Sequence, residues 1–184
     1  MIRIEIDEPT LARTRIAISP LAVFLGRALP YAGNGLLIAT CTLAGGALLL
    51  GLRIPLAALP GLAVALSIGS LSCGFFGLTL GALGLRFRDV WAVSNVSVAL
   101  LLLLTGVNVP SDRLPGWMAG IGRVLPITHA AEAARLLAGG RGFGPAIPAL
   151  GWEVAVGAGY AVLAALLLKV FELESRRHAS LDTL

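Results

Sequence analysis

The chain has 184 residues, of which 57% are hydrophobic and 13% are charged, and its mean hydropathy is +0.90. Soluble domains are about half apolar and about a quarter charged, so this composition excludes an ordinary soluble domain and indicates a membrane protein with several spans. The net charge of +4 comes from basic residues scattered among apolar runs, which argues against nucleic-acid binding.

The segment 1–27 is predicted to stay outside the membrane. It begins with an acidic stretch that lacks the apolar core of a cleavable signal sequence. Asp7 or Thr10 can cap a short helix that Pro20 ends, and Leu11 lies on its apolar face. We expect this helix to lie on the cytoplasmic surface of the membrane.

Four apolar runs follow, each long enough to cross a hydrocarbon core of about 30 Å. They cover residues 29–52, 56–84, 90–109 and 147–171. Backbone groups find no water in lipid, so each run must be helical, and the runs are too long and too uniformly apolar for barrel strands. The predicted fold is therefore an all-α, polytopic membrane domain over 28–171, followed by a cytoplasmic tail at 172–184.

Charged residues indicate how the spans are oriented. With both termini in the cytoplasm, nine of the 14 Lys and Arg lie on the inner side and five on the outer side. Arg86, Arg88 and Asp89 mark a membrane boundary, because one charge at the bilayer centre costs about 2.5–3.5 kcal/mol. Asp89 can also cap the third helix. The expected location is the inner, or plasma, membrane.

Small residues recur along the second run at steps of four, three, four and three positions, which places them on one helical face. They are Ser70, Gly74, Gly77, Gly81 and Gly84. Such residues let helix backbones approach closely in lipid. We expect this small-residue stripe to pack within the subunit, with a seam to a second copy as the alternative.

Residues with catalytic or ligand chemistry are few. His129, Glu132 and Arg135 share one helix face, so Glu132 can pair with Arg135, but no nucleophile accompanies them. The glycine-rich residues 138–145 are not a phosphate-binding loop, because the only lysine, Lys169, lies elsewhere. No cluster has metal-ligand spacing, and we expect no ionisable residue in the middle of a span. The sequence therefore predicts neither an enzyme nor a cofactor or metal site.

Four motifs follow one another along the middle of the chain. They are RFRD at 86–89, TGVNVP at 105–110, LPGW at 114–117 and PITHAAEAARLL at 126–137. In this order and spacing they resemble the distal part of an ABC-2 type transporter permease, the membrane subunit of an ATP-driven exporter. Within that family the chain is most similar to drug and antibiotic exporters of the daunorubicin-resistance kind.

The resemblance implies roles for two sets of residues. The helix near the N-terminus would be the coupling helix that docks on the ATPase, through Thr10, Leu11, Arg15 and Ile18. Residues 110–138 would form two short helices dipping into the outer leaflet, with the family residues Pro110, Pro115, Trp117, Pro126, His129, Glu132 and Arg135. Pro115 and Thr128 are the expected starts of these helices.

The resemblance also implies partners. They are an ATP-binding-cassette ATPase subunit that hydrolyses ATP, a second permease subunit and membrane lipid. The family has two further spans before the coupling helix. The resemblance therefore leaves three alternatives: a shortened gene, a misassigned start with the spans encoded upstream, or a split permease in which another chain supplies them.

The expected function is export of a hydrophobic or amphiphilic substrate, such as a drug, an antibiotic or a lipid-linked molecule, because polar groups within the spans are few. The alternative is a non-transporting membrane scaffold or assembly protein held together by small-residue packing.

Overall fold

A computed structural model describes residues 20–51, 54–84, 90–108 and 113–179, and all regular structure within these ranges is helical. In chain order the elements are α2 (Pro20–Leu50), the 3-10 turn η1 (Leu56–Ala58), α3 (Leu59–Gly84), α4 (Val90–Leu104), α5 (Gly116–Gly122), α6 (Thr128–Ala138), the 3-10 turn η3 (Gly144–Ala146) and α7 (Ile147–Ala179). The predicted all-α class is confirmed.

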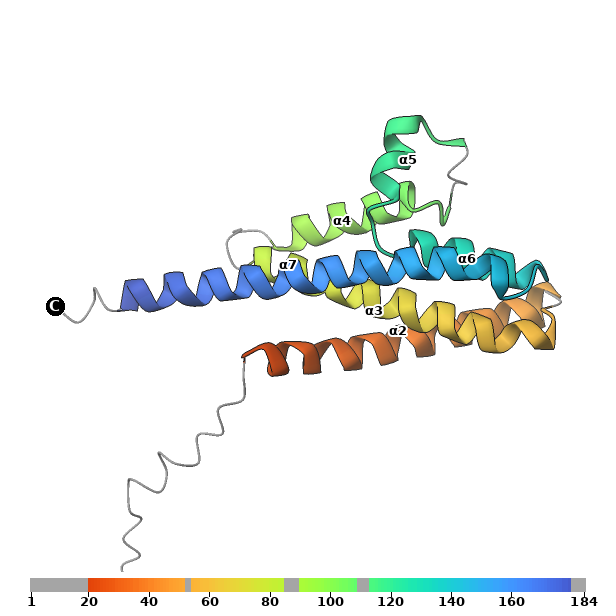
Figure 1. The fold of residues 1–184 in the computed structure, drawn as a ribbon, viewed down its shortest axis with the longest axis horizontal. Coiled ribbons are helices and arrows are strands. Elements are labelled where there is room, and N and C mark those ends of the chain that lie inside the picture. The colour runs from red at the N-terminus through yellow and green to blue at the C-terminus, as the bar shows by residue number, and fades with distance from the viewer. Residues whose placement is uncertain (1–19, 52–53, 85–89, 109–112, 180–184) are drawn as a thin grey trace, which may run out of the picture.

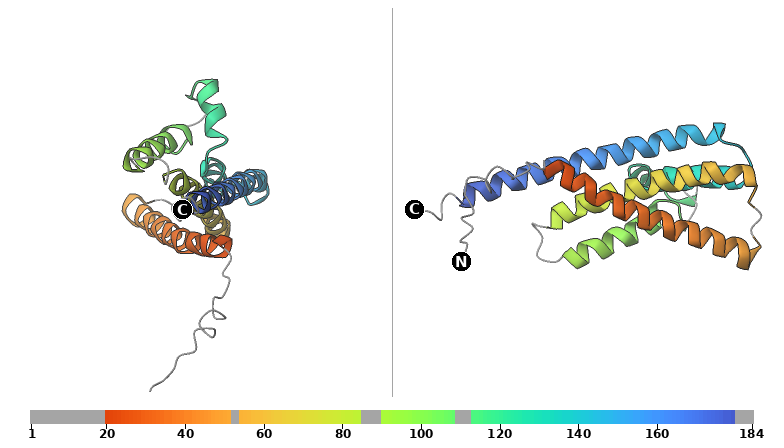
Figure 2. Two further views of the ribbon diagram at one scale, coloured as in Figure 1. Left: turned by 90° about the vertical axis from the view of Figure 1, so that its left-hand side faces the viewer. Right: turned by 90° about the horizontal axis from the view of Figure 1, so that it is seen from below.

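The long helices run roughly along one axis, and α3 is the central helix (Figure 1). Helix α3 packs against α7, α2 and α6, and α6 in turn packs against α7. Helix α4 makes few contacts, mainly with α3 and α5, and α5 stands across the direction of the long helices (Figures 1 and 2). The start of α2, the end of α3, the start of α4 and the end of α7 all point toward the same end of the molecule (Figures 1 and 2).

Small residues form the buried core, while large apolar side chains are on the surface. The core cluster joins η1, α3, α6, η3 and α7 and consists of Ala58, Leu62, Ala65, Ala133, Leu137, Ala146, Ala149 and Leu150. By contrast, Leu48, Leu49 and Trp91 are each more than 80% exposed. Contiguous apolar surface of this kind is rare on soluble monomers, whereas small interior residues and a large-residue exterior suit helices packed in lipid.

Glycines set the closest approaches of α3 to its neighbours. A Cβ added at Gly69 of α3 would lie 2.9 Å from the Cβ of Ala130 on α6. A Cβ added at Gly157 of α7 would lie 3.1 Å from the Oγ of Ser72 on α3. The helix backbones are therefore nearly in contact at both places.

Within the part of the chain that the structure describes, two helical segments are long and apolar enough to cross a membrane by length and composition. They are Leu56–Gly84, which is η1 with α3, and Gly144–Phe171, which is η3 with most of α7. The apolar parts of α2 and α4 are shorter, at Gly33–Leu49 and Trp91–Leu104.

Helix α2 begins earlier than the predicted first span. It starts at Pro20, inside the predicted cytoplasmic segment 1–27, and passes through Pro30. Proline is tolerated in the first turn of a helix because its missing N–H would have no partner there. The proline that was expected to end one helix therefore begins another.

Two other helices end at different places from the predicted spans. Helix α4 ends at Leu104, before the predicted end at 109, and the following Gly106 has a positive φ of 73° that a helix cannot continue through. Helix α7 continues to Ala179, through most of the predicted tail, since its Glu, Leu and Arg residues are good helix formers.

Candidate functional site

The first turn of α6 has an N-cap residue that cannot cap it. Ile127 occupies that position, and its aliphatic side chain offers no acceptor to the free N–H groups of the turn. Among the described residues, Ile127 is also the one non-glycine residue with a positive φ, 71°. This conformation costs a β-branched residue about 1–3 kcal/mol, so the surrounding structure has to hold it there.

Glu153 of α7 supplies the missing cap. Its Oε1 accepts a hydrogen bond from the N–H of Ile127 at 2.7 Å. Its Oε2 accepts hydrogen bonds from the N–H groups of His129 and Ala130 at 3.1 Å and 3.2 Å. The Glu153 side chain is fully buried. Three donors and the positive end of the α6 dipole thus stabilise a carboxylate that is shielded from solvent.

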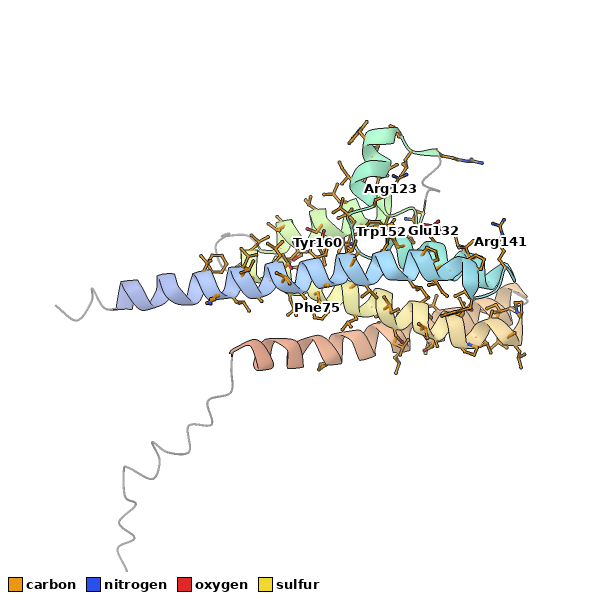
Figure 3. The ribbon with its side chains drawn as sticks, viewed as in Figure 1. Phe75, Arg123, Glu132, Arg141, Trp152 and Tyr160 are labelled. Atoms are coloured by element: carbon orange, nitrogen blue, oxygen red, sulfur yellow. The ribbon has the colours of Figure 1, made fainter. Side chains whose placement is uncertain are left out.

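Two further hydrogen bonds connect the chain before α6 to its neighbours. Thr128 Oγ1 donates to the carbonyl oxygen of Gly122 at the end of α5, at 2.6 Å. The hydroxyl of Tyr160 on α7 donates to the carbonyl oxygen of Val124 at 3.1 Å. Figure 3 labels Tyr160 on α7 and Arg123 at the end of α5. Helices α5, α6 and α7 therefore meet through a set of polar contacts.

Helix α6 is also tied to the end of α4. The Arg135 guanidinium donates a hydrogen bond to the carbonyl oxygen of Gly106, rather than pairing with Glu132. The Glu132 carboxylate lies 4.0 Å from Nδ1 of His129, and its side chain is 62% exposed. His129, Glu132 and Arg135 do share one helix face, but Arg135 bonds to the backbone carbonyl of Gly106 instead of to Glu132.

An apolar cavity of about 1050 Å³ lies between α2, α3 and α6. Helix α6 forms one wall with Ile127, Ala130, Ala131 and Ala134. Helix α3 contributes the small residues Ser70, Gly74, Gly77 and Gly81. Among the described residues that line the cavity, none is Asp, Glu, Lys, Arg or His. The cavity therefore suits an apolar occupant better than a charged one.

A family model for the ABC-2 type transporter matches residues 4–137, which is well over half of the chain. The chain belongs to the ABC-2 type transporter family. No curated protein and no solved structure matches it significantly. ABC-2 permeases are the membrane components of transporters and generally work with an ATP-binding-cassette ATPase. The predicted family is confirmed, and the protein is a membrane protein.

The small-residue stripe of this ABC-2 domain is packed at its two ends and open in its middle. A Cβ at Gly35 of α2 would lie 3.0 Å from the Oγ of Ser70, and Gly84 is buried. A Cβ at Gly77 or Gly81 would meet no atom of the described residues within 4 Å. For these two glycines, packing within the subunit stays a prediction, and the observed environment is the cavity.

The other predicted ABC-2 residues divide into two groups. Pro115 immediately precedes α5, Pro126 is buried, and Trp117 is 69% exposed, as a membrane-interface anchor would be. Helix α6 begins at Thr128. The rest lie outside the described residues: Thr10, Leu11, Arg15, Ile18, Arg86, Arg88, Asp89 and Pro110.

Glu153 is the residue that the sequence reasoning missed. It is the only acidic residue between Ile147 and Phe171, so it lies within the predicted fourth span. An acid in an otherwise apolar span signals a partner, because a lone charge in lipid is too costly. That signal was available, but the partner is the backbone of α6, which no side-chain pattern reveals.

Described residues of the ABC-2 domain hold no cluster of three His, Cys, Asp or Glu that could bind a metal ion. What the arrangement provides is an apolar cavity with one wall, α6, fixed by hydrogen bonds to α5, to α7 and to the chain just after α4.

Proposed function

We propose that this protein is the membrane subunit of an ATP-binding-cassette exporter, which moves a hydrophobic or amphiphilic molecule out of the cytoplasm with energy from a separate ATPase subunit. The apolar cavity is the observation that carries the proposal. It lies within an ABC-2 domain, it is large enough for a drug-sized molecule, and its described lining is almost entirely apolar.

The chemistry of the cavity supports an apolar cargo. A charged molecule entering it would lose its hydration and gain no ionic partner from the described lining residues. An apolar or amphiphilic molecule would instead exchange water or lipid for alanine, glycine and leucine surfaces at little cost. Drugs, antibiotics and lipid-linked molecules belong to this class.

The arrangement of the helices supports a topology with both termini in the cytoplasm. The start of α2 and the end of α7 point toward the same end of the molecule, as do the two ends that flank residues 85–89 (Figures 1 and 2). That end would face the cytoplasm and the ATPase, which would dock on residues 10–18. Helices α5 and α6 would then lie in the outer leaflet. A second permease subunit would complete the pathway.

The cavity can be filled without disturbing the packing. Gly77→Leu would project a side chain into the cavity from a position with open space around its Cβ. Gly159→Leu is the matched control, because Gly159 is exposed on α7, has open space around its Cβ and does not line the cavity. The two variants add the same apolar volume to long helices.

The test is transport in vesicles by the assembled transporter, which contains this chain, its cognate ATPase and the two further spans expected before the coupling helix. Transport is measured as ATP-dependent movement of a fluorescent amphiphilic dye. We expect Gly77→Leu to lower the maximal rate severely and Gly159→Leu to leave it near the unsubstituted rate. No ATP-dependent transport by the unsubstituted assembled transporter would refute the export function and favour the scaffold role. Equal rates for the two variants would remove the cavity from the pathway.

A further inference from the structure

We propose that Glu153 is a positioning residue that holds α6, one wall of the apolar cavity, in its place against α3. The positioning depends only on contacts within the chain. Its consequence for transport rests on the proposed function.

Glu153 bonds directly to the backbone of cavity-lining residues. Two of the three N–H groups that donate to its carboxylate belong to Ile127 and Ala130, and both residues line the cavity. Because the bonds are to the backbone, they fix the path of the chain and not merely one side-chain rotamer. A shift of Glu153 would therefore shift the wall.

Ala130 is held from two sides. Its N–H is bonded to Glu153 of α7, and its Cβ lies where Gly69 of α3 leaves room for it. Helix α6 is wedged at this point between the two longest apolar segments of the fold. Sliding α6 along α3 would require the Glu153 bonds to break.

The turn before α6 depends on the same carboxylate. Ile127 has a strained positive φ, and its N–H donates the shortest of the three bonds, at 2.7 Å to Oε1 of Glu153. Glycine adopts this conformation without strain, whereas isoleucine adopts it only when held. Without Glu153 the turn would relax, and the first turn of α6 would rotate away from its place.

Among the described residues, no side chain other than Glu153 accepts a hydrogen bond from the N–H groups at the start of α6. Ile127 has no side-chain acceptor, and the Thr128 hydroxyl is directed at the carbonyl oxygen of Gly122. The site is buried in a membrane domain, where water does not readily replace a lost acceptor. Removing the carboxylate therefore leaves buried donors unpaired.

Cross-linking measures the placement of α6 without reference to transport. In a background of Cys41→Ser and Cys73→Ala, the substitutions His129→Cys and Trp152→Cys put thiols on α6 and α7, where the native rings have centroids 6.4 Å apart. The probe is a short bis-maleimide added to the full chain in membranes. The rate of cross-linking reports how firmly α6 is held on α7.

Two variants separate positioning from general stability. Glu153→Gln keeps the side-chain volume but leaves one acceptor oxygen and aims an NH₂ group at backbone donors. Thr79→Val is the matched control, because it removes a hydroxyl on α3 that lies 2.9 Å from the carbonyl oxygen of Phe75 on α3 and 3.1 Å from that of Tyr160 on α7, without touching α6. Adding Ile127→Gly to Glu153→Gln tests the turn.

We expect Glu153→Gln to slow cross-linking about tenfold, the effect of leaving one buried donor unpaired. Thr79→Val should cross-link at the same rate as the double-cysteine chain without further substitution. Adding Ile127→Gly to Glu153→Gln should restore much of the lost cross-linking rate, which a volume-filling role for Glu153 would not produce. Three results would each overturn the proposal: Glu153→Gln cross-links as fast as the double-cysteine chain without further substitution, Thr79→Val slows cross-linking as much as Glu153→Gln does, or Ile127→Gly restores none of the lost rate.

Transport is measured separately on the cysteine-intact chain, where Glu153→Gln should lower the maximal rate more than Thr79→Val does. If the unsubstituted protein transports nothing while the cross-linking results are as expected, the export function fails and the positioning role stands. If transport is normal in Glu153→Gln and cross-linking is also unchanged, the positioning role fails and the export function stands.

Discussion

Replacing Gly69 by alanine tests the close contact between α3 and α6. The new Cβ would lie 2.9 Å from the Cβ of Ala130, well inside the ~3.5–4.0 Å of an ordinary carbon contact. The Ala130 methyl group cannot rotate away, because it is attached to a backbone whose N–H is bonded to Glu153. Overpacking of this kind costs about 1–3 kcal/mol of folding free energy.

Gly77→Ala is the matched control for this substitution. Gly77 lies on the same helix, but a Cβ there meets no described atom within 4 Å. Both changes share the gain of about 1 kcal/mol that alanine has over glycine in a helix. The difference in unfolding free energy between Gly69→Ala and Gly77→Ala therefore isolates the clash, which we expect to be about 1–3 kcal/mol.

The assay is unfolding by SDS titration in mixed micelles, followed by circular dichroism. Gly69→Ala combined with Ala130→Gly removes the clashing methyl, so the double-mutant cycle should show a favourable coupling of about 1 kcal/mol or more. Equal unfolding free energies for Gly69→Ala and Gly77→Ala, or a coupling near zero, would show that α3 and α6 are not packed as described.

Two further predictions concern topology and the ATPase. In intact cells, cysteines at 87 and 178 should be shielded from an impermeant thiol reagent and one at 112 should react; labelling at 178 without labelling at 112 would invert the orientation. Replacing Leu11 and Ile18 together by aspartate should abolish co-purification with the cognate ATPase while leaving membrane insertion intact, because these side chains would form the apolar docking face. Unchanged co-purification would remove the coupling role from this segment.

Polar contacts hold the short helix α6 in position in a fold that has few large buried side chains. An eleven-residue helix is marginal in isolation, and the tertiary contacts have to supply its stability. Its first turn is bonded to α7, its Thr128 side chain to α5, and its Arg135 side chain to the chain after α4. Helix α6 thereby links elements that otherwise touch little.

The sequence by itself determined the class, the family and most of the helices. Lipid leaves a backbone no alternative to internal hydrogen bonds, so long apolar runs predict helices from length and composition alone. Helix-start signals at Pro115 and Thr128 predicted α5 and α6, which begin at Gly116 and Thr128. Four motifs indicated the family without any structural information: RFRD, TGVNVP, LPGW and PITHAAEAARLL.

Only the tertiary structure decided which faces meet. A periodic stripe shows that small residues share a helix face, but whether that face is packed or open depends on where the neighbouring helices cross. Gly69, outside the predicted stripe, makes the close contact, while Gly77 within it lines a cavity. Glu153 and its donors are 23 to 26 positions apart along the chain, and the donors are backbone N–H groups, which every residue type except proline has. The side-chain pattern therefore indicates that Glu153 has a partner but not which one, because the contact forms only when α6 and α7 pack together.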